Sequence, residues 1–136
     1  MSQVFLCYSS RDECAAAEFR DELCRHGLKV WWDAELPRAK NWATELGRAL
    51  EKSDSMIVLV SPNSMNSDLV LRELRHAICH ENFEHRLFPV ILEQTSVMPW
   101  FFKMLPVFDI TKNRSRGITG LVRAIKTHRT AARSSA

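Results

Sequence analysis

The chain has few of the residues and segments that mark several classes of protein. Its 136 residues include only four glycines, five prolines and four cysteines, and no two cysteines form a CxxC pair. We therefore expect no disulfide scaffold and no cysteine-rich zinc site, but reduced and mostly buried thiols. No apolar run approaches the roughly 20 residues that cross a bilayer. No basic region precedes the short apolar stretch near Met1, so we expect a cytoplasmic protein with neither a secretion signal nor a membrane partner.

What remains is the composition of one ordinary folded domain. Hydrophobic residues make up 46% of the chain and charged residues 26%. A chain of this length buries a sizeable core but is too short for two domains. We place the domain at residues 1–130 and expect the Ser-containing residues 131–136 to form a C-terminal linker or disordered tail.

Positive charge is concentrated at the C-terminal end. The formal net charge is +3, but seven of the 19 basic residues follow Asp109, and no acidic residue does. Such asymmetry attracts nucleic acid, an anionic surface or the acidic face of another copy. The segment lacks the interleaved aromatic residues of a single-strand-binding groove. We therefore favour a solvated helix face and keep nucleic-acid binding as the weaker alternative.

Strand-like and helix-like segments alternate along the whole chain. Strands are expected at residues 4–8, 28–32, 56–60, 87–92 and about 107–109. Apolar residues at helical spacing lie between or after them, within residues 15–23, 42–50, 70–78 and 118–125. The run at 56–60 is apolar without interruption, which suits a strand buried on both faces. The alternation predicts an α/β fold with a parallel sheet, helices on both faces and right-handed crossovers.

Three local signals refine these elements. Ser10 and Glu13 have the spacing of a capping box, which predicts that the first helix starts there. Gly27 supplies the left-handed residue that commonly ends a helix. Pro89 lies inside the fourth strand and has no amide hydrogen, so we expect its nitrogen to face a gap or an edge of the sheet.

Parallel α/β folds bind ligands at the carboxyl ends of their strands. The loops at 9–12, 33–41, 61–68 and after Leu92 are therefore the candidate site. The first of these loops has no glycine, which excludes a Rossmann dinucleotide site. The third strand ends in Ser61 rather than in an aspartate, which excludes a phosphoacceptor receiver domain, and the P-loop pattern is absent.

Four segments, in order and covering nearly the whole chain, resemble the signature boxes of the TIR (Toll/interleukin-1 receptor) domain family. They are Val-Phe-Leu-Cys-Tyr-Ser-Ser-Arg-Asp at 4–12, Gly-Leu-Lys-Val-Trp-Trp-Asp at 27–33, Leu-Val-Ser-Pro-Asn at 59–63 with Ser67 and Glu73-Leu74, and Phe-Pro-Val-Ile-Leu at 88–92. The resemblance implies a flavodoxin-like five-stranded sheet. It also implies one of two functions: a scaffold that contacts other TIR domains, or an enzyme that cleaves NAD+ between nicotinamide and ribose.

For the enzymatic branch, which includes many bacterial members, the resemblance assigns the catalytic role to Glu73. A carboxylate beneath the ribose stabilises an oxocarbenium-like transition state, and the neutral nicotinamide leaves without needing a proton. The same resemblance places the substrate against Tyr8, Ser9, Ser10, Arg11, Asp33, Trp42 and Leu69. We predict an NAD+ glycohydrolase or cyclase activated by self-association, with NAD+ as substrate and no further cofactor. A catalytically inactive scaffold is the alternative.

Two departures from the family pattern favour that alternative. Family enzymes usually carry a tryptophan four residues before the catalytic glutamate, and this chain has Leu69 there. The loop after the second strand normally contains a glycine near its end, whereas residues 37–41 here read Pro-Arg-Ala-Lys-Asn. We expect a stiffer loop to support assembly contacts less well, and the predicted enzymatic activity depends on that assembly.

The third predicted helix also carries a competing pattern. Glu73, His76 and His80 are spaced to share one face of that helix, and His85 lies nearby in the sequence. Such a set has the donor types of a divalent metal site. We expect no metal, because no supporting carboxylate can be assigned from the sequence.

Overall fold

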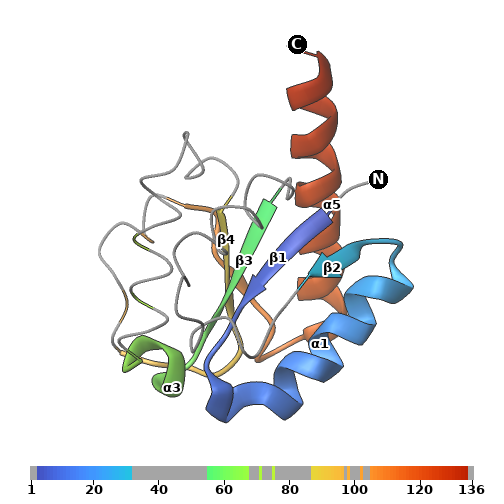
Figure 1. Cartoon of the computed structure of the whole chain (residues 1–136). Helices are drawn as coiled ribbons and strands as arrows, with labels where there is room; N and C mark the ends of the chain where they lie inside the picture. The colour runs from blue at the N-terminus through green and yellow to red at the C-terminus, as the bar shows by residue number, and fades with distance from the viewer. Residues whose placement is uncertain are drawn as a thin grey trace, which may run out of the picture.

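A computed structural model gives the chain a five-stranded parallel sheet (Figure 1). The structure describes residues 3–31, 55–67, 71, 75, 87–96, 98, 102 and 105–134. The strands are β1 (Gln3–Cys7), β2 (Lys29–Trp31), β3 (Ser55–Val60), β4 (Leu87–Ile91) and β5 (Phe108–Asp109). Their order is β2-β1-β3-β4-β5, and each neighbouring pair is parallel. The predicted flavodoxin-like α/β fold class is confirmed.

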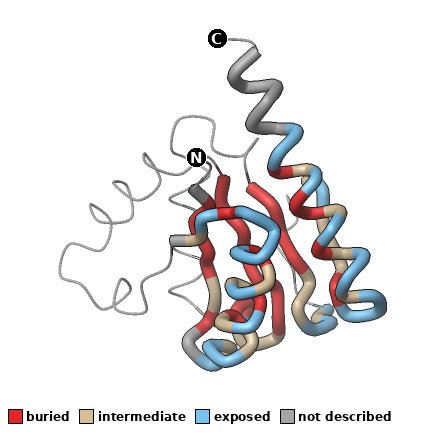
Figure 2. The backbone as a smooth tube through the Cα atoms, turned by 90° about the vertical axis from the view of Figure 1, so that its right-hand side faces the viewer, coloured by how far each residue is buried: buried red, intermediate tan, exposed pale blue. Residues whose placement is uncertain are grey.

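Helices α1 (Glu13–Arg25) and α5 (Arg114–Ser134) share one hydrophobic core with the sheet. Along the described part of each helix, buried residues recur between intermediate and exposed ones (Figure 2), as expected for amphipathic helices on a sheet. The core cluster includes Val4, Leu6, Phe19, Leu23, Ile57, Leu59, Leu121 and Ile125. Alternate strand positions such as Phe5 and Met56 are also buried. The sheet is therefore covered on both faces, as its continuous apolar strands predict.

The first helix does not begin with the predicted capping box. Ser10 lies in a 3-10 turn, η1 (Ser10–Asp12), and the N-cap of α1 is Asp12. The Asp12 side chain makes no hydrogen bond to the first helix amides. The capping-box prediction for Ser10 and Glu13 is wrong, because the 3-10 turn moves the start of the α-helix to Glu13 itself.

The end of α1 is the one predicted. Gly27 has φ +86°, the left-handed conformation that favours glycine. Its amide donates to the carbonyl of Cys24 at 3.0 Å, and the amide of Leu28 donates to the carbonyl of Leu23 at 3.2 Å. These two bonds form a Schellman motif, which satisfies carbonyls that the helix leaves without an internal partner.

Pro89 sits inside β4 without disrupting the sheet. The amide of Leu92 donates to the carbonyl of Val60 on β3 at 2.9 Å. Because amides alternate in direction along a strand, the nitrogen of Pro89 points away from β3. The pairing of β4 with β5 begins only at Val90. The proline nitrogen therefore faces a position beyond the ladder, as predicted from its missing hydrogen.

Helix α5 continues through most of the segment expected to be a tail. It extends to Ser134, so residues 131–134 are helical, and its end projects beyond the sheet (Figure 1). The domain boundary at residue 130 stays a prediction. Within the described part of the chain, no helix combines the length and hydropathy needed to cross a membrane.

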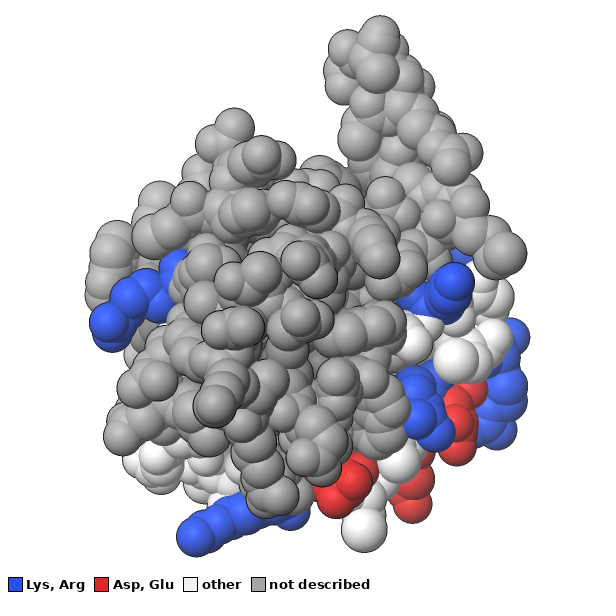
Figure 3. Space-filling view, viewed as in Figure 1, with Lys and Arg blue, Asp and Glu red and all other residues white. Residues whose placement is uncertain are grey.

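Two of the C-terminal basic residues bind α1. The Nε of Arg114 donates to Oε1 of Glu22 at 2.7 Å, and Nζ of Lys126 donates to the carbonyl of His26 at 3.0 Å. A cation near the last carbonyls of a helix is favourable. Figure 3 shows basic and acidic side chains interspersed on this side of the molecule. Part of the positive charge thus joins α5 to α1, and nucleic-acid binding stays the weaker alternative.

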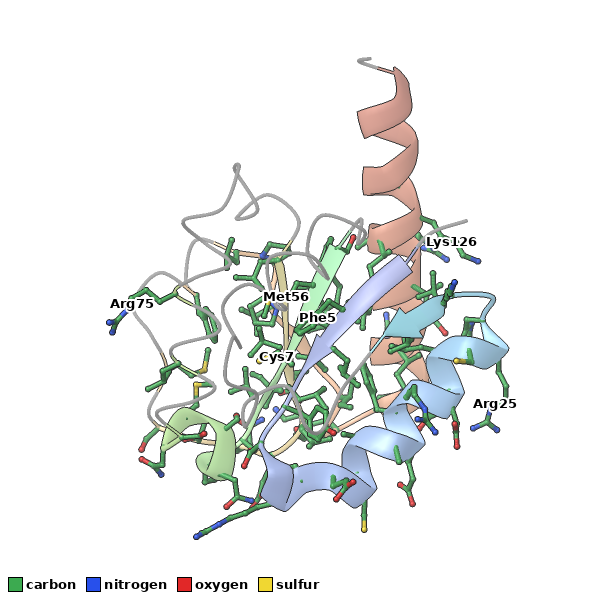
Figure 4. The ribbon with its side chains drawn as sticks, viewed as in Figure 1. Phe5, Cys7, Arg25, Met56, Arg75 and Lys126 are labelled. Carbon is green, nitrogen blue, oxygen red and sulfur yellow. The ribbon has the colours of Figure 1, made fainter. Side chains whose placement is uncertain are left out.

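Two of the three described cysteines are exposed. Cys7 is buried in β1 and lies near Phe5 in the middle of the sheet (Figure 4). Cys14 and Cys24 are exposed and free. The prediction of mostly buried thiols is wrong for these two, because α1 turns the face that carries Phe19 toward the core and leaves both cysteines on the outside.

Candidate functional site

A pocket of about 360 Å³ lies at the carboxyl ends of the neighbouring strands β1 and β3. Its described lining consists of Ser9, Arg11, Pro62, Asn63, Asn66 and Ser67. The first two residues follow β1, and the other four belong to helix α3 (Pro62–Met65) or directly follow it. Two of the loops predicted from topology, 9–12 and 61–68, therefore meet in one pocket at the edge where parallel sheets bind ligands.

The loop after β1 is held by short-range hydrogen bonds. Ser9 is buried, and its Oγ accepts from the amide of Arg11 at 3.3 Å. The carbonyl of Ser9 accepts from the amide of Asp12 at 2.8 Å. The loop backbone is thus fixed, while the side chain of Arg11 is exposed at the pocket.

The other wall is a short capped helix that the sequence does not predict. Oγ of Ser61 accepts from the amide of Ser64 at 3.1 Å, and Oγ of Ser64 accepts from the amide of Ser61 at 2.9 Å. These are the two reciprocal bonds of a capping box, with Pro62 in the first turn. The usual pattern has Glu or Gln in the position of Ser64, so the sequence predicts only a loop here.

The Asp12 carboxylate joins the two walls. Oγ of Ser61 donates to its Oδ2 at 2.5 Å, and Nδ2 of Asn63 donates to its Oδ1 at 2.8 Å. Asp12 was not among the predicted site residues. The one sequence signal for this contact is that both loops follow strands expected to be buried and parallel. The carboxylate fixes the position of the α3 wall relative to the β1 loop.

Replacing Asp12 with asparagine is expected to lower the free energy of unfolding by about 1 kcal/mol. An amide has only one acceptor oxygen, so one of the two donors, Ser61 or Asn63, then faces an NH2 group. Urea titration followed by circular dichroism measures the loss. Asp21→Asn is the matched control, because Asp21 is an exposed acid on α1 whose contact with Arg20 is long, at 3.4 Å. Equal losses in both variants would show that the Asp12 contacts contribute nothing specific.

The structure brings together part of the predicted site. Ser9 and Arg11 line the pocket. Tyr8 instead packs against the core cluster that α1 and α5 share with the sheet. The backbone of Ser10 lies in η1, and the structure does not describe its side chain. Contact of Tyr8 and Ser10 with the substrate stays a prediction.

The other predicted residues lie outside the described part of the chain. These are Asp33, Trp42, Leu69 and Glu73, together with His76, His80 and His85 of the alternative metal set. Leu71 and Arg75, which lie on either side of Glu73 in the sequence, are helical. Among the described residues alone, no three histidine, cysteine or acidic side chains are grouped as metal ligands.

A family model described as the TIR domain matches residues 4–123. The chain belongs to the TIR domain family. The match includes both loops of the pocket, so the predicted family is confirmed, although its NAD+-cleaving branch is not distinguished from the others.

Solved structures agree with the fold of this TIR domain. The TIR domain of the Toll-related receptor TRR-2 from Hydra magnipapillata is similar at 22% identity and a TM-score of 0.71, covering 90% of this chain and 97% of that one. The SEFIR domain of IL-17 receptor B matches at 17% identity and a TM-score of 0.59, covering 91% and 96%. The TIR domains of the activated Roq1 resistosome match at 23% identity and 0.55, covering 93% and 84%. No curated protein matches the sequence. Identities this low establish the fold alone.

This TIR domain has a second polar cluster, at the carboxyl end of β5. Oδ1 of Asp109 accepts from the hydroxyl of Thr111 at 2.5 Å and from its amide at 2.8 Å, and Oδ2 accepts from Nε2 of Gln94 at 2.9 Å. These hydrogen bonds, chiefly that of the Thr111 hydroxyl, lower the pKa of Asp109. Since both carboxylate oxygens are occupied within the chain, the cluster holds the segment after β4 to the end of β5.

The lowered pKa of Asp109 predicts a loss of stability in acid. The ionised carboxylate is favoured in the folded state, so its contribution is full above the ordinary value of 3.8 and disappears as the pH falls through the lower folded pKa. Thr111→Val, which removes the hydroxyl donor, is expected to flatten the dependence of the unfolding free energy on pH below 4. Thr119→Val, on exposed α5 surface, is the control. Parallel pH profiles for the wild type and Thr111→Val would exclude this role.

Proposed function

We propose that this TIR domain is an NAD+ nucleosidase, a glycohydrolase or an ADP-ribosyl cyclase. The observation that carries the proposal is the pocket that joins Ser9 and Arg11 to α3 at the carboxyl edge of the sheet. The family resemblance assigns the loop of these two residues to substrate binding. Arg11 contributes an exposed guanidinium there, a group well matched to the phosphates of a dinucleotide.

The reaction breaks the bond between C1′ of the ribose and N1 of nicotinamide. Both bonding electrons go to the ring, which changes from a cation to neutral nicotinamide, and positive charge develops on the sugar. The resemblance gives Glu73 the task of stabilising that charge, as carboxylates do in glycoside hydrolysis. Attack on C1′ by water, which loses a proton, gives ADP-ribose. Attack by a nitrogen of the adenine of the same molecule gives the cyclic product.

We propose that activity requires association of several copies. The resemblance implies that a neighbouring subunit supplies part of the pocket through one of its loops. Other TIR domains are thus the expected protein partners, as in the Roq1 TIR domains, which were solved within an activated resistosome. A sensor or partner domain in the cytoplasm then switches catalysis by controlling assembly, which is a mechanism suited to signalling in immune defence.

The test is the release of nicotinamide from NAD+. The chain is incubated with NAD+ over a range of protein concentrations and also clustered on lipid vesicles through an affinity tag, and free nicotinamide is measured by chromatography. We expect turnover per chain to rise with concentration and with clustering. If no nicotinamide is released in any of these conditions, the enzymatic proposal is wrong.

The second candidate function is a TIR scaffold without catalysis. Leu69 in place of the usual tryptophan and the loop at 37–41 without a glycine favour it. The scaffold function is supported if light scattering shows concentration-dependent assembly and the same samples release no nicotinamide.

A further inference from the structure

A second pocket, of about 380 Å³, lies between the last turn of α1 and the start of α5. Its described lining consists of Glu22, Arg25, His26, Arg114, Ser115 and Ile118. The described linings of the two pockets share no residue. They lie toward opposite ends of α1, which is about 20 Å long, because the loop 9–12 precedes this helix and His26 follows it. We call the second one the α1–α5 pocket.

Positive charge exceeds negative charge around the α1–α5 pocket. Arg25 and Arg114 each carry a guanidinium, which only donates hydrogen bonds, and Glu22 is the one acid among the described lining residues. Nζ of Lys126 donates to the carbonyl of His26 at 3.0 Å, which brings a third cation close to the lining. Arg25 and Lys126 lie on the same side of the molecule (Figure 4). The pocket therefore favours an anionic ligand.

Glu22 holds one edge of the Arg114 guanidinium and fixes its direction. Nε of Arg114 donates to Oε1 of Glu22 at 2.7 Å, and Nη2 contacts the same oxygen at 2.6 Å. The Arg114 side chain is 38% exposed, so the group is oriented without being enclosed. Among the described residues, Nη1 has no hydrogen-bond partner. This nitrogen is therefore available to an acceptor oxygen of a ligand.

Arg25 is also held by one nitrogen only. Its Nε donates to the carbonyl of Asp21, one turn earlier in α1, at 3.3 Å. This bond leaves the two terminal nitrogens available for a ligand. Ser115 is exposed at the start of α5 and adds a hydroxyl. Donors from two different helices thus border one pocket, and together they match a ligand group with several acceptor oxygens.

We propose that the α1–α5 pocket binds a small phosphomonoester, with its phosphate on Arg25 and Arg114 and its organic group in the remaining volume. Such a phosphate carries up to two negative charges near neutral pH and three terminal oxygens, which suit the fork of an arginine. A carboxylate has one charge and two oxygens, so it leaves donors unused. The volume of about 380 Å³ falls within the range of small-molecule sites, and a phosphate alone fills only part of it.

This site goes beyond the proposed cleavage of NAD+ and does not depend on it. Both phosphates of NAD+ are diesters within the pyrophosphate, so NAD+ lacks the terminal phosphate that the α1–α5 pocket is proposed to recognise. A ligand here contacts both α1 and α5. Binding is therefore expected to stabilise the packing of the two helices against each other, in the same way that any ligand of the folded state does.

The first test compares ligands of the full chain by calorimetry at low salt. Phenyl phosphate is the probe. Benzoate keeps the ring but has a carboxylate, and methyl phenyl phosphate keeps the phosphorus but has one charge and two terminal oxygens. We expect phenyl phosphate to bind about tenfold more tightly than either, the effect of one lost charged hydrogen bond. Inorganic phosphate is expected to bind more weakly than phenyl phosphate, and NAD+ is expected not to displace it.

Variants locate the binding in the α1–α5 pocket. Glu22→Gln is expected to tighten phenyl phosphate binding about three- to tenfold at low salt, because a negative charge that faces the ligand is removed and Arg114 is released. Arg25→Gln is expected to weaken binding about tenfold. Arg123→Gln is the matched control, because it removes the same charge from an exposed position on α5 outside the described lining. Its affinity is expected to stay within twofold of the wild type.

The results are read independently of nicotinamide release. Tighter binding in Glu22→Gln and weaker binding in Arg25→Gln support the site whether or not the chain cleaves NAD+. A misfolded variant cannot produce the gain expected for Glu22→Gln. The proposal is wrong if phenyl phosphate does not bind the wild-type chain, or binds no better than benzoate or inorganic phosphate. It is also wrong if Glu22→Gln does not tighten binding, or if Arg25→Gln and Arg123→Gln weaken binding equally.

Discussion

Replacing Glu73 with glutamine is expected to slow nicotinamide release by about 10²- to 10³-fold, the usual cost of losing one preorganised electrostatic group. Glutamine keeps the size and hydrogen-bonding capacity of the side chain but removes the negative charge. If that charge stabilises the developing oxocarbenium ion, kcat falls, whereas the KM for NAD+ changes little because the ground-state ribose carries no such charge.

Glu18→Gln is the matched control for this experiment. Glu18 is exposed on α1, so the same chemical change there is expected to leave the rate within twofold. Circular dichroism and light scattering on both variants show that folding and assembly are intact. If the Glu73→Gln variant is as active as the wild type, Glu73 takes no part in catalysis. The reaction would then need another charged group.

The positions of the strands and their parallel direction could be predicted, because apolar runs and their alternation with helices are visible in the sequence. Runs such as 56–60 are apolar without interruption, and burial on both faces is the environment of a parallel strand. The end of α1 was equally predictable, because Gly27 provides a backbone conformation that other residues avoid. These features depend on neighbouring residues alone.

The walls of the pocket could be predicted only in part. Topology predicts the loops 9–12 and 61–68 at one edge of the sheet, and the family resemblance assigns Ser9 and Arg11 to the site. The bond from Asn63 to Asp12 joins residues 51 positions apart, and no local pattern encodes such a partner. Asp12 is not predicted as a site residue, because the capping box predicted at Ser10 already accounts for the start of the helix. The contact forms only where the fold brings both loops together.

The two glycines of α5 differ in their contacts with distant residues, which the sequence again does not predict. The effect of this difference can be measured. Gly117 and Gly120 lie three residues apart in one helix, and nothing in the sequence ranks them. A Cβ on Gly117 would lie 2.8 Å from Cγ2 of Ile110 and 2.9 Å from the backbone oxygen of Asp109. For a Cβ on Gly120, the nearest atom among the described residues is Cε1 of Phe108, at 4.0 Å. The helix therefore approaches the end of β5 closely at Gly117.

Alanine at these two positions is expected to change stability in opposite directions. Gly117→Ala should lower the free energy of unfolding by about 1–3 kcal/mol, because buried Ile110 and the backbone of Asp109 must move to admit a methyl group. Gly120→Ala should raise it by up to about 1 kcal/mol, because alanine loses less backbone entropy in a helix and has space there. Urea unfolding of both variants measures the difference. Equal gains in the free energy of unfolding would mean that α5 and β5 are not in close contact at Gly117. The hydrogen-bonded cluster around Asp109 would then not be supported by α5.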